Sequence, residues 1–160
     1  MKCALEMTVA IQNKLAEEEK ERIRKAKEDE IKRQLQIAKE YEDYLKYKPT
    51  LDKYFEKNLL KGNGSMVFLV QKSKRATDKE NMYIIVEKNY QYSKYKPYWY
   101  NDILSDPFHL NDYLKSLTDL CYNVEVKDGS FTAYSSSGAS TRQMNCLEIK
   151  VSIPETIPCV

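Results

Sequence analysis

A densely charged segment without glycine or proline constrains the fold of this chain most. Between Glu17 and Arg33, 14 of 17 residues are charged, and no glycine or proline precedes Pro49. Opposite charges recur four residues apart, and each such pair stabilises a helix by about 0.2–0.5 kcal/mol. The pairs are Glu18 with Arg22, Glu21 with Lys25, Glu28 with Lys32, and Asp29 with Arg33. The pattern predicts one helix from about Ala4 to Tyr47, ended by Pro49 and roughly 60 Å long.

Apolar residues follow this helix at helical spacing but without a strict heptad. They are sparse in the middle and denser towards the end: Ile23, Ala26, Ile31, Leu35, Ala38, Tyr41 and Leu45. A coiled-coil seam would repeat every 3.5 residues, which this stripe does not do. We expect either a solvated helix whose last two turns dock on a domain, a coiled-coil or hairpin homodimer, or partial disorder at the N-terminus. The candidate helix contacts are Ile23, Ile31, Leu35 and Tyr41.

The pattern of the remaining residues predicts short strands grouped into hairpins, with the helices segregated from them along the sequence. We expect a short helix from Thr50 to Leu60, strands from Ser65 to Gln71 and from Met82 to Glu87, and a helix beginning at Asp106-Pro107 and ending near Leu117. Further strands are expected from Cys121 to Val126, from Ser130 to Tyr134 after a tight turn at Asp128-Gly129, and from Met144 to Ile153 after a flexible loop.

This order predicts an α+β fold: a long charged N-terminal helix followed by a small antiparallel sheet with one or two packed helices. The expected domains are residues 1–48, a charged helix that is an extension or a partner contact, and residues 49–160, a compact α+β domain.

The side-chain inventory argues against an enzyme. His109 is the one histidine, only four glycines occur, and no pair of cysteines has C-x-x-C spacing. Histidine-rich zinc sites and glycine-rich phosphate loops are therefore excluded, and we expect no catalytic residue, metal or cofactor. His109 has Asp106 and Asp112 close by in sequence, but it fits an ordinary half-buried histidine better. A hydrolase that uses Asp102, Asp106, Asp112 and Asp119 is the distant alternative.

The cysteines and the N-terminus indicate a reducing compartment. The four cysteines are expected to be free and mostly buried, with Cys121 and Cys146 as core residues. The short apolar stretch from Cys3 to Ile11 is interrupted by Glu6 and lacks a cleavage-like site, so it is not read as a signal peptide. No run approaches the roughly 20 apolar residues that span a bilayer. We expect a cytoplasmic protein without membrane association.

A basic segment rich in tyrosine is the main candidate surface for a partner. Residues 61–100 carry 8 basic and 3 acidic side chains, although the whole chain has a net charge of +2. The candidate contacts are Lys74, Arg75, Tyr90, Tyr92, Lys94, Tyr95, Lys96, Tyr98 and Trp99. Cations with flat rings suit nucleic acid, and the same aromatic residues suit protein recognition. Tyrosines that merely cover the sheet are a further interpretation.

The chain resembles small accessory proteins of bacteriophages and mobile elements of low-GC bacteria. The resemblance lies in composition and in the ending formed by Leu114 to Leu117, Tyr122 to Val126 and Leu147 to Val151. It implies a non-enzymatic protein-binding protein, for example an inhibitor of a host-defence nuclease or an assembly factor, in the host cytoplasm. The alternative is a nucleic-acid-binding accessory protein that uses residues 72–100.

Overall fold

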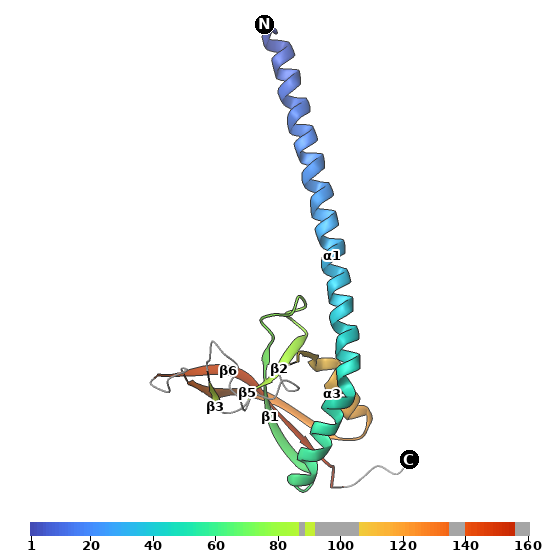
Figure 1. The fold of residues 1–160 in the computed structure, drawn as a ribbon, viewed down its shortest axis with the longest axis vertical. Helices are drawn as coiled ribbons and strands as arrows, with labels where there is room; N and C mark the ends of the chain where they lie inside the picture. Colours follow the sequence, from blue (N-terminus) through green and yellow to red (C-terminus); the bar gives the residue numbers. More distant parts are fainter. Residues whose placement is uncertain (87–88, 92–105, 135–139, 156–160) are drawn as a thin grey trace. The chain divides into compact units, whose positions relative to one another are not determined.

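The chain has the predicted α+β fold in a computed structural model, which describes residues 1–86, 89–91, 106–134 and 140–155. It divides into two units, Met1–Lys39 and Glu40–Val160. The elements, labelled in Figure 1, are α1 (Ala4–Lys61), β1 (Ser65–Lys72), β2 (Met82–Val86), β3 (Asn89–Gln91), β4 (Phe108–His109), α3 (Leu110–Asp119), β5 (Asn123–Tyr134) and β6 (Thr141–Ser152).

Helix α1 does not end at Pro49, so the prediction of two helices on either side of this proline was wrong. A proline inside a helix removes one backbone hydrogen bond and crowds the preceding turn, at a cost of about 3 kcal/mol. On either side of Pro49, however, Tyr44 and Leu51 are buried at 1% and 0% exposure. Their packing in the second unit outweighs the local preference. The helix ends instead at Lys61, just before Asn63 and Gly64, which have positive φ angles of 53° and 91°.

The described strands of the second unit form a sheet with the order β3-β5-β6-β1-β2-β4. Strands β1 and β2 form the predicted antiparallel hairpin, and β6 pairs antiparallel with both β1 and β5. The sheet is antiparallel as predicted, except at its edge, where the three-residue strand β3 pairs parallel with β5. Strands β5 and β6, with 12 residues each, are longer than the other described strands of the sheet (Figure 1).

The core lies between one face of the sheet and two helical segments. Leu51, Phe55 and Leu59 of α1 contribute to it together with Leu110, Tyr113 and Leu117 of α3. They cover Phe68 and Val70 of β1 and Ile149 and Val151 of β6. A smaller cluster with Leu69, Phe131 and Cys146 belongs to the other face, because successive strand residues point to opposite sides.

No turn occurs at Asp128-Gly129, which corrects a second prediction. These residues lie inside β5, where Asp128 is paired with Leu147 and Gly129 with Cys146. A Cβ atom on Gly129 would lie 3.2 Å from the Cβ of Glu148, so this glycine serves close packing and not a turn. The chain reverses after Tyr134, which is paired with Thr141, and residues 135–139 of the predicted loop lie outside the described residues.

The prediction that a helix begins at Asp106-Pro107 was also wrong. Helix α3 begins at Leu110 and not at Pro107, and Asp106 is not its cap. Phe108 and His109 are instead paired with Tyr83 and Met82 as strand β4, and the buried Phe108 explains why this segment joins the sheet.

The cysteines only partly follow the expectation of buried thiols. Cys146 is buried and free, whereas Cys3 and Cys121 are free and exposed, so the prediction for Cys121 was wrong. Cys121 precedes β5 and has a positive φ of 69°, which places it in the turn after α3. Cys159 lies outside the described residues.

Candidate functional site

The first unit, Met1–Lys39, exposes nearly all of its side chains. Every residue in it is exposed except Ala10 and Ile37, which are half-buried. Helices in proteins owe most of their stability to tertiary packing, so a helix with this exposure needs another source of stability.

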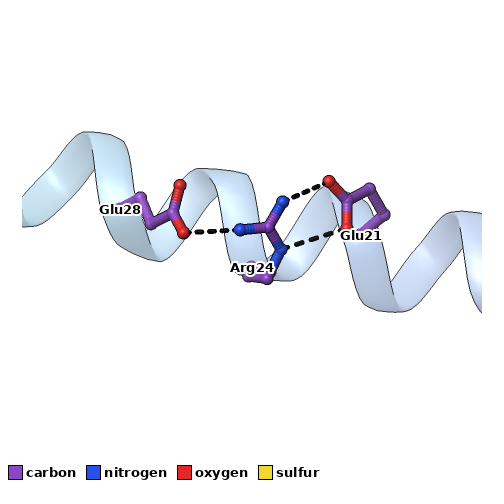
Figure 2. A network of polar contacts seen from close by, with 3 residues as sticks. All are labelled: Glu21, Arg24 and Glu28. Atoms are coloured by element: carbon purple, nitrogen blue, oxygen red, sulfur yellow. Dashed lines mark hydrogen bonds and ion pairs between the residues drawn. The ribbon is translucent and has the colours of Figure 1, made fainter.

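Ion pairs between neighbouring turns contribute to that stability, at about 0.2–0.5 kcal/mol for each pair. Arg24 lies between two glutamates: its Nε is 3.0 Å from Oε2 of Glu21, and its Nη1 is 2.6 Å from Oε1 of Glu28 (Figure 2). Arg22 pairs with Glu19, and Arg33 pairs with Glu30. Two of the predicted pairs were therefore wrong, because Arg22 and Arg33 each pair with a glutamate three residues earlier. The predicted partner of Glu21, Lys25, does act on it, since its charge helps to lower the pKa of this glutamate.

These contacts also shift the protonation of the glutamates. The hydrogen bonds from Arg22 and Arg24 lower the pKa of Glu19 and of Glu21. The charged segment is therefore a helix that stabilises itself while its surface stays in water.

The turns before this charged segment have a different surface. Between Ala4 and Ala16 the only charged residues are Glu6 and Lys14. Leu5, Ile11 and Leu15 are 74%, 53% and 59% exposed. Met7 and Val9 are exposed as well. Residues 4–16, called here the apolar segment of α1, thus present large apolar side chains to solvent.

Three of the predicted helix contacts lie further along the first unit. Ile23, Ile31 and Leu35 are 45%, 61% and 66% exposed. Tyr41, the fourth, belongs to the second unit, and its hydroxyl donates a 3.1 Å hydrogen bond to Oδ2 of Asp112. Leu5, Ile11 and Leu15 were not among the predicted contacts, although the low charge density of their segment was a signal for them.

Of the predicted basic and aromatic contacts, the structure describes the side chains of two. Lys74 and Arg75 are exposed in the connection between β1 and β2. The carboxylate of Glu40 holds this connection by accepting hydrogen bonds from the backbone N–H groups of Thr77 and Asp78, at 2.8 and 3.2 Å. Tyr90 lies in β3, where its backbone is paired with Ala133. The remaining contacts lie outside the described residues: Tyr92, Lys94, Tyr95, Lys96, Tyr98 and Trp99.

His109 has a structural role. Its Nδ1 accepts a 3.2 Å hydrogen bond from the backbone N–H of Asp112 and so caps the start of α3. Its ring meets that of Tyr41 edge-on, with 5.7 Å between centroids. A catalytic histidine would need the carboxylate of Asp112 beside its imidazole. This carboxylate instead accepts a hydrogen bond from the hydroxyl of Tyr41.

Two buried tyrosines nearby are unsuited to act as bases. Burial, followed by the neighbouring carboxylates of Asp112 and Asp52 respectively, raises the pKa of Tyr44 and that of Tyr113. Among the aspartates of the hydrolase alternative, Asp106 is exposed and Asp102 lies outside the described residues. Within the part of the chain that the structure describes, no three His, Cys, Asp or Glu side chains gather as a metal site would require.

Comparisons with protein-family models, curated proteins and solved structures find no match to this chain. Among the described residues, none of the helices is both long enough and apolar enough to cross a bilayer.

Proposed function

We propose that this chain is a non-enzymatic protein-binding protein that contacts its partner through the apolar segment of α1. The observation that carries the proposal is the exposure of Leu5, Ile11 and Leu15 on successive turns that contain almost no charge.

Burying such side chains stabilises a complex. Moving a leucine or isoleucine side chain from water into an apolar contact contributes about 1.5–3 kcal/mol. Exposed apolar surface of this kind is typical of interaction sites, and an apolar helix face is a common mode of protein recognition.

The charged segment from Glu17 to Arg33 complements this role. Its ion pairs within the helix support helical structure without requiring contact along its whole length. It can therefore keep the apolar segment helical before a partner binds, which lowers the entropic cost of binding.

The identity of the partner stays a prediction. Inhibition of a host-defence nuclease, a role in assembly and an origin in a bacteriophage rest on the resemblance in composition alone. Nucleic-acid binding by residues 72–100 also stays a prediction, because most of its aromatic residues lie outside the described part of the chain.

Site-specific photo-crosslinking in the source cell tests the proposal. A photoreactive side chain at Ile11 should form an adduct with a polypeptide of discrete mass. The matched control is Leu120 of the second unit, which is 67% exposed and should give no such adduct. Absence of a polypeptide adduct at Ile11, or equal adducts at both positions, would contradict the proposal.

A further inference from the structure

We infer that the partner of the apolar segment is a second copy of the chain, bound antiparallel. The inference rests on the proposed function, in that it assumes this segment to be a protein contact. Three features carry it: a face free of charge, a residue pattern that is nearly symmetric about Ala10, and the position of the acidic run that follows.

The apolar segment has one face without charge. Leu5, Thr8, Gln12 and Leu15 recur at intervals of three and four residues, so they lie on one side of the helix. Ala4, Val9, Ile11 and Ala16 flank this row, whereas Glu6 and Lys14 lie on the opposite side. The charge-free face can therefore pack against another helix without burying a charge.

The same face reads almost identically in both directions. Counting outward from Ala10, Val9 corresponds to Ile11 and Thr8 to Gln12. Leu5 corresponds likewise to Leu15, and Ala4 to Ala16. A two-fold interface brings a surface against its own copy, so it requires this kind of self-complementarity.

In the antiparallel pair, Leu5 packs near Leu15 of the second copy, and this contact occurs twice. Thr8 meets Gln12 of the second copy at the centre, where their polar groups fix the register as buried polar pairs do in coiled coils. The flanking Val9 and Ile11 side chains close the two sides of this contact.

The charges favour the antiparallel over the parallel arrangement. A parallel pair in register would place the acidic run from Glu17 to Glu19 beside its own copy. The antiparallel pair places this run beside Lys2 and the helix N-terminus of the second copy, where the helix dipole favours negative charge. The crowded charges beyond Glu19 then lie outside the overlap, consistent with their pairing within their own helix.

Sedimentation equilibrium of the full chain tests the pairing. The wild type should shift with concentration from the monomer mass of 18.8 kDa towards that of a dimer. Leu5→Glu should remain monomeric. Met7→Glu, which adds the same charge at an exposed apolar residue on the opposite side, should associate like the wild type, and circular dichroism should show that both variants keep their helix.

The orientation is measured with a spin label at Lys27→Cys, in a chain with Cys3, Cys121 and Cys159 replaced by serine. The antiparallel pair predicts about 50 Å between the labels, and a parallel pair only about 10–20 Å. A wild type that is monomeric at every concentration, the short label distance, or equal disruption by both glutamate variants would overturn the inference. The proposed function would survive each of these results if Ile11 still crosslinked to a foreign polypeptide.

Discussion

The hydroxyl of Tyr113 on α3 donates a 2.9 Å hydrogen bond to Oδ1 of Asp52 on α1. The other oxygen of Asp52 lies 3.3 Å from Nζ of Lys48. This bond joins the two helical segments that cover the sheet of the second unit, at a tyrosine with no exposed surface. Tyr113→Phe should lower the free energy of unfolding by about 1 kcal/mol, measured by urea denaturation near neutral pH. An unchanged midpoint would show that the bond adds no net stability.

The same tyrosine makes the second unit sensitive to alkali. Burial, followed by Asp52, raises the pKa of Tyr113, so its contribution to stability is fully present below the ordinary tyrosine pKa of about 10. That contribution is lost as the pH rises through the raised value. The free energy of unfolding of the wild type should fall above about pH 10. That of Tyr113→Phe should fall less steeply, because only the loss caused by ionisation of Tyr44 remains. Equal slopes for both proteins in denaturation series between neutral and alkaline pH would contradict this assignment.

The cap formed by His109 gives a second stability prediction. His109→Ala removes the acceptor for the Asp112 N–H and should lower the free energy of unfolding by about 1 kcal/mol. His109→Asn, which restores a capping acceptor, should recover most of the loss. If thermal or chemical unfolding shows the two variants to be equally destabilised, ring packing against Tyr41 and not capping accounts for the effect.

The ion pairs of the first unit predict a dependence on salt and acid. Arg24→Gln removes the contacts with Glu21 and Glu28 and should lower the helical circular dichroism signal at low salt. Lys27→Gln is the matched control. High salt should reduce the difference, because it screens exposed charges.

Acid should also lower the helical circular dichroism signal of the wild type. Hydrogen bonds from Arg22 and Arg24 lower the pKa of Glu19 and that of Glu21. The stability that these ion pairs give to the helix is therefore present above the pKa of an unfolded glutamate, and it is lost as the pH falls through the lowered pKa of the folded state.

Equal helicity of Arg24→Gln and the wild type at low salt would show that the ion pairs of Arg24 do not stabilise the helix.

The nucleic-acid alternative makes a separate prediction. If residues 72–100 bind nucleic acid, the chain should retard single-stranded or duplex nucleic acid in a gel at low salt, and charge reversal of Lys94 and Lys96 should abolish the shift. Our account of a protein-binding chain predicts no shift. A shift that these substitutions remove would favour the alternative.

Hydrophobic periodicity predicted the main elements of this fold because burial follows it closely. Strands β1 and β2 and the body of helix α3 were predicted from the spacing of apolar residues. Signals that depend on a single residue or dipeptide were less reliable. Pro49, Asp128-Gly129 and Asp106-Pro107 each have a strong local preference, and in each case pairing or packing with distant residues outweighed it.

The candidate site was harder to predict for a different reason. Apolar residues such as Leu5 and Leu15 are equally common in a buried core and at an exposed contact surface. The sequence alone does not distinguish these two environments. Their exposure becomes visible only in the structure.

Crosslinking from Ile11 in the source cell, with the mass of the adduct determined, tests the central claim most directly. The account predicts a discrete adduct between two polypeptides, with the mass of two copies of this chain if the pairing inference also holds. Recovery of the unmodified monomer alone, or of an adduct with nucleic acid, would contradict the claim that this helix binds protein.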